Sequence, residues 1–114
     1  MISATLDSSV YVRAFNFGGP AAKLLAYARA REIRIDISKA ILDETIGVLR
    51  EKFKRDPYTL NDIRQKLTAT CNFIASTGTL DVVKEDPDDN RILECAEAAH
   101  SEYLVSEDKD LLRL

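Results

Sequence analysis

Four acidic side chains stand where an α/β fold would bring them together. Asp7 and Asp108 follow short apolar segments directly or almost directly. Such segments predict buried strands, and the ligands of open α/β sheets bind beyond the carboxyl ends of the strands. Glu44 is three residues after Ile41 and lies at the margin of the buried stripe of its predicted helix, whereas Asp89 precedes Ile92 by three positions and faces inward. We therefore expect these four carboxylates to converge, with Asp110 as a possible fifth.

Helical phase also decides against three neighbouring acids. Asp43 is in phase with Gly47, away from the apolar stripe of its helix. Asp88 is in phase with Cys95, and Asp86 occupies the position that caps a helix. We expect these three side chains to lie outside the site.

Carboxylates crowded at one edge of a sheet repel one another, and a divalent cation relieves that repulsion. The predicted ligands are hard oxygen atoms without Cys or His nearby, which favours Mg²⁺ or Mn²⁺ over zinc. One or two such ions activate water and stabilise a phosphodiester leaving group. The pattern indicates hydrolytic nuclease chemistry.

Each acid also has a purely structural interpretation, which stays open at this point. Asp7 could form a turn, and Glu44 could be a solvated helix residue. Asp89 could belong to a capping segment that complements the helix dipole, and Asp108 could cap a last helix. Four such acids in one chain favour the site over any single structural explanation.

Other polar residues beside the acids are secondary candidates. Ser8, Ser9 and Ser106 adjoin them and could orient a water molecule or a carboxylate, although serines at turns need no such role. The one histidine, His100, lies at the predicted end of a helix, where a solvated role is favoured over catalysis.

Charge is unevenly distributed along the chain. Residues 50–66 contain six basic and three acidic side chains, whereas residues 81–110 contain eleven acids and three bases. This asymmetry is compatible with cations gathered at one place and a polyanion at another. The candidates for contact with RNA phosphates are Arg13, Arg50, Lys54 and Arg55.

Alternating patterns in the first half of the chain predict strand, helix, strand and helix. Residues 2–6 form a buried strand, a turn at residues 16–19 precedes a helix from Pro20, and Ile33, Ile35 and Ile37 mark a strand with one buried face. Ser38 caps a helix that buries residues as far as Phe53 and ends at residues 56–57.

The second half continues the alternation. A helix opens with a capping box at residues 59–62 and closes at Gly78, and residues 80–83 form a strand. A helix begins at residues 86–89, residues 103–105 form a strand, and residues 108–112 begin a last helix. The order predicts a three-layer α/β/α sandwich with a central parallel sheet.

Length and composition are those of one globular domain spanning residues 1–114. The chain is 46% hydrophobic and 31% charged, with a net charge of −3. No apolar stretch is long enough to cross a bilayer and no secretion signal begins the chain, so we expect a cytoplasmic protein without membrane contact. Cys71 and Cys95 lack metal-ligand spacing and are interpreted as buried thiols, not as a disulfide.

Four segments resemble the PIN-domain family in order and spacing: LDSSVYV, ILDETIGVL, DPDDNRILECA and YLVSEDKDLL. Together they span nearly the whole chain. The sequence is most similar to toxin components of bacterial and archaeal toxin-antitoxin pairs. The acids of the family's motifs fall on Asp7, Glu44, Asp89 and Asp108, which are the residues chosen above. The resemblance implies Mg²⁺ or Mn²⁺ as cofactor, RNA as substrate, a homodimer, and a cognate antitoxin that blocks the site.

The sequence departs from the family pattern at two places. Ser9 stands where relatives commonly have asparagine, and the chain ends at Leu114, before the further strand and short helix that complete the sheet in relatives. A shortened member, a fragment, or a protein whose sheet edge is covered by a partner all fit this ending.

Two other functions compete with the ribonuclease. One is a catalytically inactive PIN-like module that binds RNA or protein, which the short ending favours. The other is phosphoryl transfer through an aspartyl phosphate on Asp7. The sequence gives it no support, because no lysine follows a later strand where this chemistry would need one.

Overall fold

The computed structural model describes residues 1–75, 87–106 and 112–113, with the backbone alone described for residues 87–90 and 112–113. Within these residues the strands are β1 (Ser3–Leu6), β2 (Arg34–Ser38), β3 (Asn72–Ile74), β4 (Tyr103–Val105) and β5 (Leu112–Arg113). The helices are α1 (Ser8–Phe17), α2 (Gly19–Arg29), α3 (Lys39–Glu51), α4 (Pro57–Thr70) and α5 (Pro87–Ala99).

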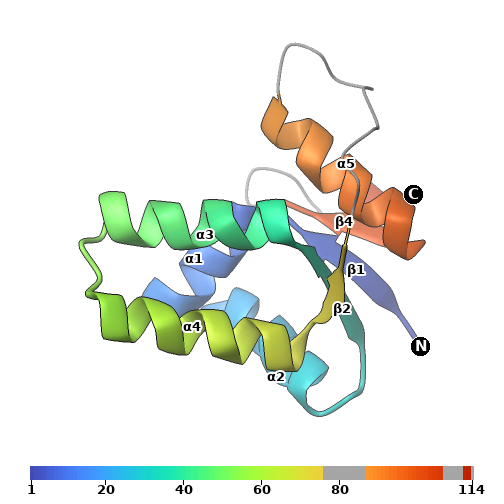
Figure 1. The fold of residues 1–114 in the computed structure, drawn as a ribbon. Helices are drawn as coiled ribbons and strands as arrows, with labels where there is room; N and C mark the ends of the chain where they lie inside the picture. Colours follow the sequence, from blue (N-terminus) through green and yellow to red (C-terminus); the bar gives the residue numbers. More distant parts are fainter. Residues whose placement is uncertain (76–86, 107–111, 114) are drawn as a thin grey trace.

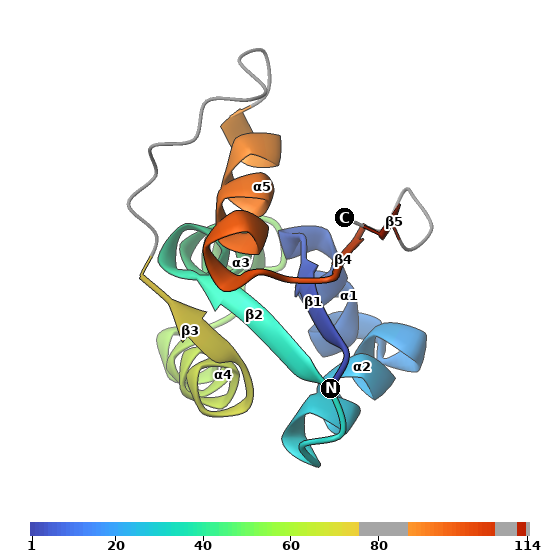
Figure 2. The ribbon, with the colours of Figure 1, turned by 90° about the vertical axis from the view of Figure 1, so that its right-hand side faces the viewer.

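The strands form one sheet in the order β3-β2-β1-β4-β5 (Figure 2). The first four strands of that order are parallel, and β5 pairs with β4 in the antiparallel direction. α1 to α4 lie on one side of the sheet and α5 covers the other (Figures 1 and 2). The predicted α/β/α sandwich with a parallel central sheet is confirmed.

The main core lies between the sheet and the helices α1 to α4. Leu6 of β1 and Ile35 and Ile37 of β2 are buried there, together with Ile41 and Leu49 of α3. Side chains alternate between the two faces of a strand, so the intervening residues of β1 and β2 point toward α5. That second face is polar.

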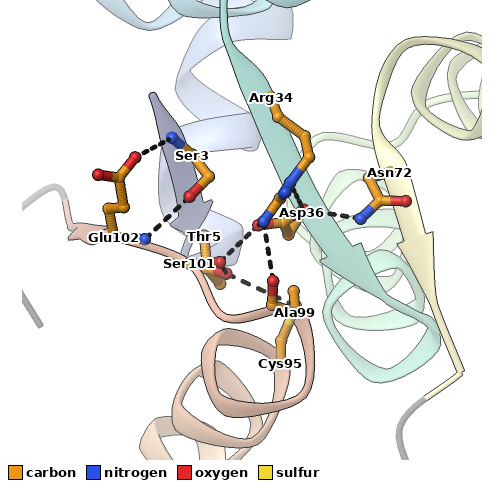
Figure 3. A network of polar contacts seen from close by, with 9 residues as sticks. All are labelled: Ser3, Thr5, Arg34, Asp36, Asn72, Cys95, Ala99, Ser101 and Glu102. Atoms are coloured by element: carbon orange, nitrogen blue, oxygen red, sulfur yellow. Dashed lines mark hydrogen bonds and ion pairs between the residues drawn. The ribbon is translucent and has the colours of Figure 1, made fainter. Parts of the chain in front are cut away.

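Asp36 is the central residue of the polar face and is fully buried. Its carboxylate accepts hydrogen bonds from Nε of Arg34 at 2.8 Å, Nδ2 of Asn72 at 2.9 Å and Oγ of Ser101 at 2.5 Å (Figure 3). Arg34 also donates to the carbonyl of Ala99 at 2.8 Å. A buried carboxylate requires such partners. These bonds therefore connect β2 to β3 and to the end of α5.

The alternation of isoleucines predicted that β2 has only one buried face, and that expectation is wrong, because Asp36 on the opposite face is buried as well. The alternation of isoleucines with Arg34 and Asp36 is typical of a strand with one solvated face. Here α5 covers the second face, and hydrogen bonds replace water around the polar side chains.

Several helix boundaries differ from those the sequence predicted. The segment after Asp7 forms the helix α1, because Asp7 caps it, whereas we expected a connection that ended in a turn at residues 16–19. α3 ends at Glu51, which leaves Phe53 exposed instead of buried. Pro57 begins α4 with Asp56 as its N-cap, so the predicted capping box at residues 59–62 does not start that helix.

The carboxyl-terminal elements are also revised. Residues 72–74 form the strand β3 and are not part of a helix that continues to Gly78. Leu112 belongs to β5 instead of a helix. The predicted strand at residues 80–83 lies outside the described residues. Ser38 caps α3 as expected, with its Oγ accepting from the amide of Ile41 at 3.2 Å.

Cys71 and Cys95 are free and buried, as predicted. In the part of the chain that is described, no helix has the length and apolar character needed to cross a membrane.

Candidate functional site

Asp7 lies at the junction between β1 and α1. Its backbone amide donates to the carbonyl of Val105 at 3.0 Å, which continues the pairing of β1 with β4. Its Oδ1 caps α1 by accepting from the amide of Val10 at 3.1 Å, and it also accepts from Oγ of Ser9 at 2.5 Å. Asp7 therefore caps a helix, instead of forming the turn that we considered, and it also stands at the carboxyl edge of the sheet.

Glu44 lies in the middle of α3 and is mostly buried. Its Oε1 accepts a hydrogen bond from Oγ of Ser8 at 2.5 Å, and its Oε2 accepts one from Nη1 of Arg91 at 3.2 Å. The carboxylate is thus held by α1 on one side and by α5 on the other. Glu44 is not a solvated helix residue.

An open groove between α1 and α3 contains both acids. Its volume is about 460 Å³, and Ile92 of α5 also lines it. α1 with its N-cap contributes Asp7, Ser8, Ser9, Val12, Arg13 and Phe17, and α3 with the residues after it contributes Glu44, Val48, Lys52 and Phe53. The groove combines carboxylates, cations and exposed aromatic rings.

The other two predicted acids are not placed by the structure. Asp89 belongs to the first turns of α5, but its side chain lies outside the described residues, as do Asp108 and Asp110. Three residues after Asp89 on the same helix, Ile92 lines the groove. Among the side chains that are described, no three acids, histidines or cysteines gather into a metal-binding cluster.

Ser106 follows the carboxyl end of β4. Leu6 is the register partner of Val105, so Ser106 is at the same edge of the sheet as Asp7. This is the edge where the rule for α/β sheets places the ligand.

Helical phase proved a weaker guide for α5 than we expected. Cys95 and Arg91 are both in phase with Asp88, away from the inner face that we predicted for this helix. Cys95 is nevertheless fully buried, and Arg91 donates a hydrogen bond to Glu44. Asp88 is three positions before Arg91, as Asp89 is before Ile92. Phase alone therefore does not distinguish Asp88 from Asp89.

The predicted RNA-binding residues divide between two surfaces. Arg13 lines the groove with the acids. Arg50 and Arg55 instead line a second depression, of about 380 Å³, between α3 and α4. Nε of Arg50 lies 3.2 Å from Oε1 of Glu51, and Nη2 of Arg55 donates to Oδ1 of Asn16 at 2.6 Å. Lys54 has a positive φ of 55° after the end of α3.

Four residues of this region were not among the predicted site residues: Phe17, Lys52, Phe53 and Arg91. Lys52 follows Glu44 and Val48 at intervals of four, so helical spacing could have found it. Arg91 could not be found in this way, because its role depends on how α5 packs beside α3.

Comparison with known families gives one result that covers most of the chain. The family model of the PIN domain matches residues 3–110. A comparison with curated proteins found no match.

Proposed function

Because the chain belongs to the PIN-domain family, whose fold is nuclease-like, we propose that it is a divalent-metal-dependent endoribonuclease. The observation that carries the proposal is that Asp7, the N-cap of α1, and Glu44 of α3 line one open groove together with Arg13 and Lys52. Carboxylates that bind metal and cations that bind phosphate are the two requirements of hydrolytic phosphodiester cleavage.

The donor chemistry of the groove suits Mg²⁺ or Mn²⁺. Its two described carboxylates offer hard oxygen ligands, and neither cysteine nor histidine lines it. The proposed ligands are Asp7, Glu44, Asp89 and Asp108, with Asp110 as a further candidate. When bound, the metal would activate a water molecule and stabilise the leaving oxygen.

The side chains around these carboxylates would orient them. Ser9 and the amide of Val10 both donate to Oδ1 of Asp7 and would hold this carboxylate in place for the metal. Ser8 and Arg91 would fix Glu44. Outer hydrogen-bond partners of this kind set the direction of a ligand. Ser106, at the same edge, would have a similar role.

RNA would cross the groove with its phosphates near Arg13. The second depression, with Arg50 and Arg55, and the neighbouring Lys54 would contact the strand farther from the acids. Such contacts supply affinity without reading sequence.

The biological role that we propose is that of the toxin in a toxin-antitoxin pair. This role implies RNA cleavage in the cytoplasm, a cognate antitoxin protein that covers the groove, and a homodimer of the chain. The resemblance of the four sequence segments to such toxins supports this part of the proposal.

One observation favours a second function, that of an inactive module that binds RNA or protein. Arg91 is bonded to Oε2 of Glu44, so a metal ion at that oxygen would face a neighbouring positive charge. A groove whose acid is permanently paired in this way would bind without cutting.

Calorimetric titration with Mn²⁺ and an RNA-cleavage assay distinguish these two functions. The nuclease should bind Mn²⁺ and cut a mixed RNA substrate only when the metal is present. A binding module should retain RNA or a protein partner and leave the strand intact. Wild-type heats that equal those of the Asp7→Asn variant, with no cleavage, would refute the nuclease proposal.

A further inference from the structure

The end of the groove away from the acids carries two exposed aromatic rings. Phe17, the last residue of α1, is 73% exposed, and Phe53, just after α3, is 41% exposed. Both line the same groove as Asp7 and Glu44. Burial of such rings is favourable, so their exposure beside a candidate site calls for a ligand.

Helical spacing aligns the charged and aromatic groups along the groove. Ser9, Arg13 and Phe17 follow one another at intervals of four on α1. Ten residues separate Asp7 from Phe17, which corresponds to roughly 15 Å along a helix. The acids and the rings therefore stand at opposite ends, with Arg13 between them.

The groove residues of α3, and the two that follow this helix, show the same order from acid to cation to ring. Glu44, Val48 and Lys52 are also spaced by four, and Phe53 follows at once. From either wall, the groove passes from carboxylate through cation to aromatic ring.

This order fits a nucleic-acid strand whose bases are unpaired. Aromatic side chains stack on exposed bases, and cations beside them track the phosphates. A base inside a duplex has both faces covered by its neighbours and cannot stack on a protein ring. An apolar protein segment would bury the two rings but would bring no complementary charge to Lys52, which lies beside Phe53 in the groove.

We propose that Phe17 and Phe53 form a base-stacking subsite for single-stranded RNA, with Lys52 and Arg13 contacting the phosphates that lead to the acids. This inference rests on the proposed ribonuclease function and adds to it the residues that hold a base at the end of the groove away from the acids. Since stacked nucleotides rise about 3.4 Å, the bound base lies several nucleotides from the phosphate at the acids.

The test measures binding without metal, so that no cleavage is needed. The full chain carrying Asp7→Asn is titrated against short oligoribonucleotides in which the fluorescent base 2-aminopurine is moved one position at a time. Phe17→Ala and Phe53→Ala should each weaken binding by roughly tenfold, the usual loss for one stacked base. Binding should quench the fluorescence at one or two positions only, and each alanine change should abolish that quenching.

Phe73 supplies a matched control. It is 43% exposed, close to the 41% of Phe53, but it belongs to β3 and does not line the groove. Phe73→Ala should leave the affinity and the quenching unchanged. Thermal melting of each variant establishes that the fold is retained.

Substitutions by leucine and tryptophan distinguish stacking from general apolar contact. Stacking predicts that Phe17→Trp binds at least as well as the parent and that Phe17→Leu binds like Phe17→Ala. Leucine variants that bind RNA as tightly as the parent, or a duplex bound as tightly as the single strand, would overturn the subsite. Because the binding test contains no metal, stacking in that test together with no cleavage by the wild type when Mn²⁺ is added would refute only the nuclease function.

Discussion

The hydroxyl of Ser8 donates a hydrogen bond of 2.5 Å to Oε1 of Glu44, and it joins the first turn of α1 to the middle of α3. The two residues are 36 positions apart in the chain. The bond fixes one oxygen of Glu44 at the acidic end of the groove, while Arg91 fixes the other. The orientation of this carboxylate therefore depends on three helices.

Ser8→Ala should weaken Mn²⁺ binding and RNA cleavage while it preserves the fold. Loss of an outer hydrogen-bond partner of a metal ligand typically reduces affinity by about 10- to 100-fold. Calorimetry with Mn²⁺ and initial cleavage rates would measure the change. The matched control is Thr68→Ala, which removes a hydroxyl on α4 that bonds only to the carbonyl of Gln65 in the described contacts. Equal behaviour of the two variants would remove Ser8 from the site.

Asp7→Asn should abolish cleavage with little effect on stability. Asparagine caps a helix about as well as aspartate, so the free energy of unfolding should change by less than about 0.5 kcal/mol. Asp7→Ala removes the cap as well and should cost about 1 kcal/mol. Urea unfolding of both variants separates the cap from the carboxylate. Full activity of Asp7→Asn would contradict the assignment of a metal to this residue.

Parallel substitution of Asp89 and Asp88 can show which of the two is the metal ligand. If Asp89 is the metal ligand, Asp89→Asn should lower Mn²⁺ affinity and Asp88→Asn should leave it near that of the wild type. Both changes remove one negative charge near the start of α5, so their effects through the helix dipole should be similar. A larger loss for Asp88→Asn would transfer the role to that residue.

Asp36→Asn should destabilise the protein by about 3 kcal/mol or more. The hydrogen-bond donors around this buried side chain would lose the negative charge that they now face. The control is Asp43→Asn, at an ion pair with Lys39 and Arg64 on the surface. That change should cost about 1 kcal/mol or less. Equilibrium unfolding in urea compares the two, and equal losses would show that the polar face under α5 contributes no more than a surface pair.

Cys95 should be unreactive toward thiol reagents near neutral pH until the protein unfolds. Burial raises the pKa of its thiol from 9.0 to about 11. Between these values the folded protein retains a proton that the unfolded chain has lost, so stability falls as pH rises through this range. Cys95→Ala should reduce that slope in unfolding experiments from pH 8 to pH 11. Rapid labelling of native Cys95 at pH 8 would contradict its burial.

The sequence alone determined the elements whose signals are local. Residues 3–6, 34–38 and 103–105 form strands because their apolar residues must be buried, and Ser38 starts a helix because its hydroxyl caps the next turn. The alternation of these elements was enough to predict the parallel sheet and the edge at which Asp7 lies. The helix α1 was missed, although Asp7 at its N-cap was a local signal for it.

Tertiary structure decided everything that depends on contact between distant segments. No local pattern distinguishes a solvated strand face from one covered by α5, so the burial of Asp36 was not predictable. β3 needs the edge of β2 to form, since three residues have too little periodicity of their own. In the same way, the pairing of Glu44 with Ser8 and Arg91 exists only because α1, α3 and α5 pack together, and these contacts contribute free energy only once the chain has folded.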